Sequence, residues 1–334
     1  MKKNLIALAI ASAFVAPIAM ADTTVYGQAN ASVASVNNGT NSVMKVSSDS
    51  SRLGFKGSED LGGGTSVVYQ MESAINLDND GTAGTSTTLA TRNSYVGLSD
   101  AGMGTVLAGR HDTPYKIATR SLDVFADTIA DNRNLMGVKG NGGVANFDAR
   151  QGNIVAYISP VMSSVTVAAA YVTINETKTP GTDTAVSLAA MYAEGPLSAS
   201  LAYESHTLDS VALKESAVKL GGSYTIDALT LNAVYETTRD AGKHKGAYAA
   251  AKYNLGGGDA VKAAYAKALN GTQVTVGYDH SMSKRTTVYA LYTTLANKDG
   301  ANNGLAGGNS TGGFATVGAD QDPNAFSLGL KHSF

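Results

Sequence analysis

The sequence predicts an all-β protein, a transmembrane antiparallel β-barrel of about sixteen strands with short periplasmic turns and long external loops. Three features of its 334 residues predict this fold. Apolar and polar residues alternate along most of the chain. The segments that show this pattern are joined by short and long connections in alternation, and the apolar runs after residue 21 are short. The two longest, Val167–Val172 and Leu188–Ala193, have six residues each, whereas a membrane-spanning helix needs about 20.

The first 21 residues are predicted to be a secretory signal peptide, which leaves residues 22–334 as a single β-barrel domain. Lys2 and Lys3 precede an apolar run, and Ala19-Met20-Ala21 matches a cleavage site of small residues. A membrane anchor is the alternative interpretation. The run is shorter than a spanning helix and contains Pro17 near its end, which favours the signal peptide.

The composition indicates a fold held together by hydrogen bonds and packing, and it is unusual for a soluble domain of this size. Only 16% of residues are charged, and the chain has 37 Gly, 16 Tyr, no Trp and no Cys. Without cysteine there is no disulfide or thiol chemistry. Loss of Lys2 and Lys3 would take the formal charge from −2 to −4, so no basic bias points to nucleic acid.

The alternation is clearest in the last predicted strand, residues 324–334. One side carries Phe326, Leu328, Leu330, His332 and Phe334, and the other carries Ala325, Ser327, Gly329, Lys331 and Ser333. Successive side chains in a strand point to opposite faces, so this strand has one apolar and one small or polar face. The same period recurs in segments that begin at Val165, Val186, Val218 and Leu229.

Connections of two lengths separate these segments. The short ones are rich in Gly and Pro, as tight turns require: residues 59–64, 100–104, 159–164, 194–196, 225–228, 255–258 and 281–284. The longer, polar ones are residues 76–90, 111–151, 175–183, 206–213, 237–245 and 296–323. A β-sandwich also alternates, but its turns do not sort into alternating short and long sets. A β-helix would show a fixed short repeat, and none is present.

A closed barrel explains why the predicted last strand extends to Phe334. Backbone groups at an open sheet edge would have no hydrogen-bond partners in lipid, so the last strand must pair with the first, near Thr23–Val36. Phe334 then faces lipid at the membrane boundary, where Tyr and Phe form the aromatic belts in this chain without Trp.

On the second strand, Leu53 and Phe55 face outward, which places Arg52 and Lys56 in the lumen. Outward charges would cost about 2–4 kcal/mol at the midplane.

Several stretches resemble one family, the trimeric general porins of Gram-negative outer membranes, in their β-proteobacterial and neisserial branch. The matching stretches span the predicted mature chain: TVYGQANASV (24–33), SSRLGFKGSEDLGGG (50–64), VVYQME (67–72), RNSYVGLSDAGMGTVLAGR (92–110), YISP (157–160) and LGLKHSF (328–334). The resemblance implies a multi-pass protein of the outer membrane, a homotrimer of sixteen-stranded barrels, and passive passage of ions and small hydrophilic solutes. It also implies contacts with lipid and lipopolysaccharide, and recognition of Phe334 by the barrel-assembly machinery.

The resemblance further implies that the third long loop, His111–Gln151, folds into the pore. Family position adds Arg92 and Arg110 to Arg52 on the pore wall, although Arg110 shares its side of the strand with Val106 and Ala108, and Arg150 is a further candidate. Where family members often carry charge in the strand that enters "SP", this chain has Ala156 and Ile158.

Loop 3 carries the acids Asp112, Asp123, Asp127 and Asp131, interspersed with Lys116, Arg120 and Arg133. Acids that face wall arginines would create a transverse field across the constriction, and a surplus of arginine would favour anions modestly. The alternative is that some of these pairs pin the loop to the wall.

Two other functions compete with a general diffusion channel: a substrate-selective channel, and an outer-membrane enzyme carried on a barrel. An enzyme would need a nucleophile and a base that converge near one rim, and no such set is evident. The five histidines, His111, His206, His244, His280 and His332, lack the spacing of metal ligands, so neither a metal nor a cofactor is expected.

We predict that the mature protein begins at Asp22. N-terminal sequencing of protein purified from outer membranes should yield Asp22 as the first residue. Retention of Met1 would contradict both the signal peptide and the compartment that it implies.

Overall fold

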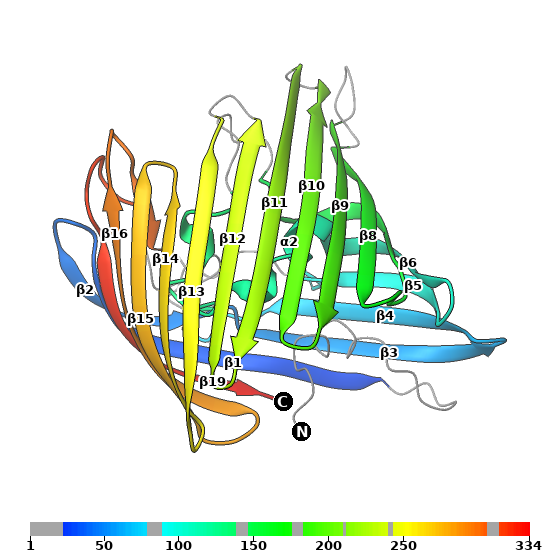
Figure 1. Ribbon diagram of the computed structural model, residues 1–334, viewed down its shortest axis with the longest axis horizontal. Coiled ribbons are helices and arrows are strands. Elements are labelled where there is room, and N and C mark those ends of the chain that lie inside the picture. The colour runs from blue at the N-terminus through cyan, green and yellow to red at the C-terminus, as the bar shows by residue number, and fades with distance from the viewer. Residues whose placement is uncertain are drawn as a thin grey trace.

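The computed structural model describes residues 23–78, 89–137, 146–175, 183–209, 212–239, 243–305 and 314–334. It shows one closed antiparallel barrel (Figure 1). The predicted signal peptide and Asp22 lie outside these ranges. The barrel strands are β1 (Thr24–Asn37), β2 (Ser42–Ser48), β3 (Arg52–Gly62), β4 (Thr65–Ala74), β5 (Ser94–Asp100), β6 (Gly104–Asp112), β7 (Arg150–Ile158), β8 (Val165–Asn175), β9 (Asp183–Glu194), β10 (Leu197–Leu208), β11 (Leu213–Ile226), β12 (Leu229–Arg239), β13 (Lys245–Gly256), β14 (Asp259–Ala268), β15 (Gly271–Ser281), β16 (Thr286–Asn297) and β19 (Asn324–Ser333).

The predicted count of sixteen strands is confirmed. The seventeen segments of the sheet form sixteen barrel strands because β2 and β3 both pair with β1 and together make one strand. Asp49–Ser51 interrupt this strand, and Ser50 adopts a positive φ of 58°. The interruption turns a short buried polar segment toward the interior instead of continuing the ladder.

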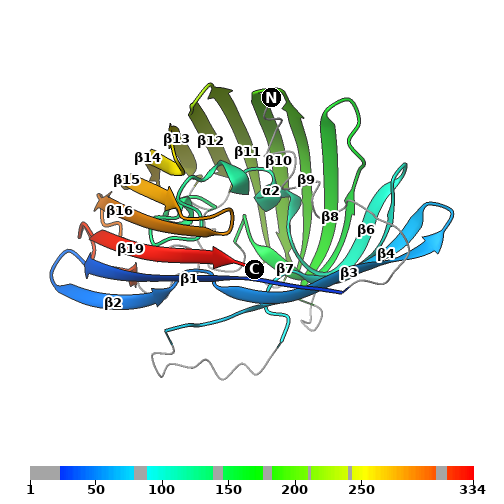
Figure 2. The same ribbon diagram turned by 90° about the horizontal axis from the view of Figure 1, so that it is seen from below.

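Closure occurs between β1 and β19, which lie side by side in Figure 2. Their register runs from Gln28 opposite Ser333 to Asn37 opposite Asn324. Beyond it, Gly27 and Phe334 exchange two backbone hydrogen bonds, of 3.0 and 3.1 Å. A Cβ on Gly27 would lie 2.5 Å from Cζ of Phe334, so glycine leaves room for the terminal ring against β1. The last residue therefore completes the barrel.

The predicted faces of the strands are also confirmed. On β19, Phe326, Leu328 and Leu330 are about half exposed on the outer surface, whereas Ala325 and Ser327 are buried inside. Val218 and Leu220 on β11 point outward in the same way. Phe55 is exposed next to inward-facing Arg52, as the alternation on that strand predicts.

The long connection between β6 and β7 enters the barrel, as Figure 2 shows for its helix α2 (Pro114–Ile117). Two short 3-10 helices follow, η1 (Arg120–Leu122) and η2 (Asn132–Asn134). Phe125, Ile129 and Leu135 of this loop pack with Leu291 and Leu295 of β16 in one buried cluster. A small hairpin of β17 (Asn303–Leu305) and β18 (Phe314–Thr316) belongs to the last long connection. Among the residues described, no helix is long and apolar enough to span a bilayer.

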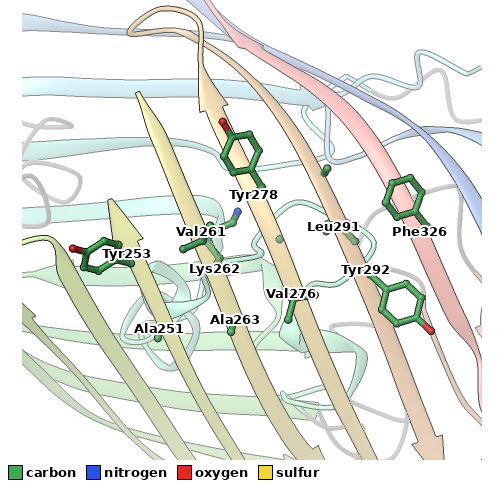
Figure 3. Close-up of a pocket in the computed structure, with 12 residues that line it drawn as sticks. Ala251, Tyr253, Val261, Lys262, Ala263, Val276, Tyr278, Leu291, Tyr292 and Phe326 are labelled. Atoms are coloured by element: carbon green, nitrogen blue, oxygen red, sulfur yellow. The ribbon is translucent and has the colours of Figure 1, made fainter. Parts of the chain in front are cut away.

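The outer surface of β13–β16 and β19 carries a shallow groove of about 530 Å³ (Figure 3). Small residues such as Ala251 and Ala263 form its floor, and Tyr253, Tyr278 and Tyr292 stand around it. Because the groove lies on the apolar outer face, the barrel wall separates it from the lumen.

Deletion of Phe334 should reduce the amount of folded barrel in the outer membrane without changing synthesis. The truncated chain loses two closing hydrogen bonds, each worth roughly 1 kcal/mol, together with the ring packed on Gly27. Heat-modifiable mobility in gels of membrane fractions measures the folded fraction. Phe334→Tyr, which keeps both features, should fold normally; equal folding of the truncated chain and the parent would show that closure does not need this residue.

Candidate functional site

Loop 3 is attached to the inner wall of β9–β15 along most of its described length. Tyr115 begins the attachment: its backbone N–H donates to Oγ of Ser187 at 2.9 Å, and its hydroxyl donates to Oε2 of Glu236 at 3.2 Å. Further hydrogen bonds tie the loop to Asn232, Tyr248, Lys262 and Gln273. The loop therefore narrows the lumen as a fixed structure.

Arg120 is the centre of the loop's internal charge network. Its guanidinium lies 3.6 Å from Asp123, 3.1 Å from Asp127 and 2.6 Å from Asp131. Arg133 adds a second cation 3.1 Å from Asp131, whose side chain is fully buried. Three carboxylates of the loop thus converge on one arginine, and these ion pairs hold the loop in its conformation.

The protonation of these acids reflects the same network. Burial alone would raise the pKa of Asp127, but the guanidiniums of Arg120 and Arg52 outweigh it and hold the pKa at about 2. Burial and the nearby charge of Asp131 instead raise the pKa of Asp123. The pKa of Asp131 is lowered because Arg120 and Arg133 more than offset its burial. At neutral pH the Asp127 and Asp131 carboxylates are therefore charged and paired.

Arg52 connects the barrel wall to this network. Its Nη1 lies 3.1 Å from Oδ2 of Asp127, and its Nη2 donates to Oε1 of Gln28 at 3.1 Å. Asn30 of β1 also donates to the backbone oxygen of Asp127 at 2.7 Å. Arg52 and Asp127 keep about a fifth of their side-chain surface exposed, so the pair borders the open lumen.

A second charged cluster lies on the wall formed by β4–β7. Arg92, two residues before the start of β5, forms an ion pair with Glu72, and Glu72 also accepts a hydrogen bond from Tyr26. Asp112 at the end of β6 binds two cations, Lys116 at 2.8 Å and Arg150 at 3.2 Å. This second cluster holds the start of loop 3 and adds further charge to the wall.

The remaining two wall cations differ in position. Lys56 lies 5.1 Å from the centroid of the Tyr26 ring, with no salt bridge in the described part of the chain. In the β5–β6 register, Arg110 lies opposite Ser94, and Ala108 lies opposite Val96. Ala108 and Val96 are exposed on the outer face. The guanidinium of Arg110 donates to the carbonyl of Thr91. Among the described residues Arg110 forms no ion pair, although its guanidinium lies near that of Arg150 in the second cluster.

Most of the charged residues singled out in the sequence therefore come together, although the pairs serve first to fix the loop. Each of the four loop acids has a cationic partner, which agrees with the pinning role left open above. Ala156 stands where family members often carry charge, and here it has a packing role, because it is buried against Leu107 and Ile154.

The sequence analysis missed a group of lumen-facing lysines below the loop. Lys252 of β13, Lys262 of β14 and Lys331 of β19 line a hollow of about 750 Å³ at the end of the barrel that carries the short turns. Lys262 lies 2.8 Å from Asp279. Alternation placed Lys331 on the polar face, and the same rule applied to β13 and β14 would have found the other two.

Histidine offers no metal site in the ranges described, where no group of three or more candidate ligands occurs. His206 instead stacks on Phe147 at 4.4 Å and bonds Glu204 at 2.9 Å behind loop 3.

Comparison with known proteins agrees with the geometry. Residues 7–300 match a family model described as Gram-negative porin. The chain is 31% identical to outer membrane porin protein 32 of Delftia acidovorans, and the alignment covers both chains in full. It is 42% identical to the major outer membrane protein P.IB of Neisseria gonorrhoeae over about a third of each chain.

Among solved structures, the anion-selective porin from Comamonas acidovorans superimposes with a TM-score of 0.79 at 26% identity, covering 94% of this chain and 100% of that one. A closed sixteen-stranded barrel, a charged loop inside it and a full-length relative all lead to one conclusion. The chain belongs to the Gram-negative porins and forms a passive channel through the outer membrane.

Proposed function

We propose that this porin is a homotrimeric channel with a modest preference for anions. The observation that carries the selectivity is the surplus of cations around loop 3. In the two charged clusters and on the wall beside them, seven cationic side chains (Arg52, Lys56, Arg92, Lys116, Arg120, Arg133, Arg150) lie among five carboxylates (Glu72, Asp112, Asp123, Asp127, Asp131). Elsewhere along the loop, Asp148 and Glu236 share the single cation Lys219, which reduces this surplus. The related protein from Comamonas acidovorans is itself described as anion-selective.

The surplus acts on ions because the constriction is narrow. Bulk solution screens charges over a Debye length of about 8 Å at physiological ionic strength, and fixed charges within that distance set the local counter-ion concentration. Transport of this kind needs no catalytic group, and the chain is a channel rather than an enzyme.

Replacement of Arg52, Arg92 and Arg150 together by Gln should shift selectivity toward cations. Removing a unit charge about 4 Å from the ion path changes the ion's energy by about 1 kcal/mol in water, so the anion-to-cation permeability ratio should fall about fivefold or more. The zero-current potential across a KCl gradient measures this ratio, and the shift should shrink at high salt.

Arg285→Gln is the matched control, since Arg285 is exposed in the short turn between β15 and β16 and belongs to neither charged cluster. This variant should keep the parent potential. An unchanged potential in the triple variant, with the trimer intact, would place the selectivity filter elsewhere.

The trimer proposal has support in the distribution of exposed tyrosines. Those with the largest exposure in the described chain all lie on the outer face of β7–β16: Tyr157, Tyr171, Tyr203, Tyr224, Tyr235, Tyr253, Tyr265, Tyr278 and Tyr292. The outer face of β1–β6 instead exposes aliphatic residues, methionine and Phe55, among them Val96, Leu98 and Val106. Aromatic belts mark contact with lipid headgroups, so a face without one suits contact with another subunit. The tyrosine-bearing face would contact lipid and lipopolysaccharide, and Phe334 would be read by the assembly machinery.

Single cysteines should distinguish the two faces, because the chain has no Cys of its own. Leu98→Cys on β5 should give cross-linked subunits with a short bis-maleimide reagent in detergent-solubilised protein. Val276→Cys, on the tyrosine-bearing face, should stay monomeric on denaturing gels. Cross-linking of Val276→Cys alone would reverse the assignment. Cross-linking of neither would show that residue 98 lies away from the three-fold axis, where identical residues of three subunits meet.

A further inference from the structure

The chamber below loop 3 consists of two hollows that meet. The first is the 750 Å³ hollow with Lys252, Lys262 and Lys331, which we call the basic hollow. The second, about 380 Å³, lies under α2 and η1 and extends to the short turns that follow β5, β7 and β9; we call it the apolar recess. Ser121, Ala193 and Ser198 line both, so one molecule can occupy the two at once.

The apolar recess has the lining of a ligand pocket. Ile117, Ala118 and Leu122 of loop 3 form one side, and Ile158 and Met191 of the barrel wall form the other. Its volume lies within the range of about 300–1,000 Å³ that is typical of small-molecule sites. Water in such a lining gains few hydrogen bonds, so an apolar group of matching size would displace it favourably.

A single buried polar atom marks the inner wall of the recess. The hydroxyl of Ser200 has almost no exposed surface and no hydrogen-bond partner among the residues described. Opposite it on β11, Gly221 is closely covered, since a Cβ there would lie 2.7 Å from both Leu122 Cδ1 and Ser200 Oγ. The recess is thus a formed feature of the packing between loop 3 and the wall.

The basic hollow carries two lysines that have no ion pair among the described residues. Lys252 and Lys262 lie directly opposite each other in the β13–β14 register, an arrangement that is unfavourable for like charges. Lys262 is balanced by Asp279 and also donates to the carbonyl of Val124. In the described chain, neither Lys252 nor Lys331 forms a salt bridge.

Three acids also line the hollow, Asp123, Glu194 and Asp279, and in the described chain none of them forms an ion pair with Lys252 or Lys331. Asp123 is bound within the loop network, where Arg120 is its partner. Glu194 sits at the exposed β9–β10 turn and accepts hydrogen bonds from Ser164 and Tyr192. Two cations therefore remain available to a ligand.

We infer that this chamber binds organic monocarboxylates that carry an aromatic or branched apolar body. The carboxylate would lie between Lys252 and Lys331, and the body would enter the recess past Ser121 and Ser198. An inorganic anion would use the lysines alone, and a neutral apolar solute would use the recess alone. The inference rests on the channel function proposed above and adds a solute class to it.

Phenylacetate and acetate are a suitable pair of probes, since both carry one carboxylate and only the first has an apolar ring. In planar bilayers with KCl, phenylacetate should reduce the current through the parent channel at concentrations roughly tenfold below those at which acetate acts. Equal potency of the two anions would overturn the inference, because the recess would then contribute nothing.

Variants test each hollow separately. Thr166→Phe, on a residue that lines the recess, should weaken the phenylacetate effect roughly tenfold while the KCl reversal potential stays unchanged. Thr166→Ser, which leaves the recess open, is its control. Lys252→Gln with Lys331→Gln should weaken the effect roughly threefold, less so at high salt.

A second variant covers the case in which Thr166→Phe folds poorly. Val161→Asp changes an exposed turn residue at the mouth of the recess and should repel the anion there. An unchanged phenylacetate effect in a folded Thr166→Phe or Val161→Asp channel would overturn the inference. Loss of KCl conductance in the parent itself would instead contradict the channel function, so the two failures can be told apart.

Discussion

Hydrocarbon offers no hydrogen-bond partners to a peptide backbone, and the structure depends on this constraint. Every barrel strand finds a neighbour on both sides, and the ring closes where β19 meets β1. The pair between Gly27 and Phe334 extends the closing ladder to the last residue. Once the ring is closed, the alternation of side chains separates an apolar outer face from a polar lumen.

Closure of sixteen strands creates an interior too wide for wall side chains to fill, and loop 3 occupies part of it. The loop carries its own apolar core, in which Phe125 and Ile129 pack against the inner wall. It also carries polar anchors such as Tyr115, whose partners lie on β9 and β12. The constriction is thus part of the folded core, and its shape is determined by packing as well as by charge.

The charges of the constriction serve two purposes at once. Arg120 pairs with three acids, of which Asp123 would otherwise be buried without a cationic partner, and Arg52 ties that network to β3. Such pairs hold the loop, because removal of one partner from a buried pair is strongly destabilising. In the function proposed above, the cations left over after pairing would determine the field that an ion meets. Stability and selectivity therefore involve overlapping sets of residues.

Much of the fold was predictable from the sequence because strand alternation is local. The outward position of Phe326 and Leu328 and the inward position of Arg52 and Lys56 follow from a period of two along single strands. Strand number follows from the alternation of short and long connections. Neither property requires knowledge of which strands are neighbours.

Partners required the tertiary structure, because they depend on register and on the path of loop 3. Alternation could not show that Asp127 meets Arg52 or that Asp112 meets Arg150, since these residues lie far apart in the chain. It left Arg110 unassigned, and the structure shows its guanidinium bonded to the carbonyl of Thr91 and near the guanidinium of Arg150. The opposition of Lys252 and Lys262 likewise arises only when β13 and β14 pair. Local periodicity determines which way a side chain points, whereas register and loop packing determine what it meets.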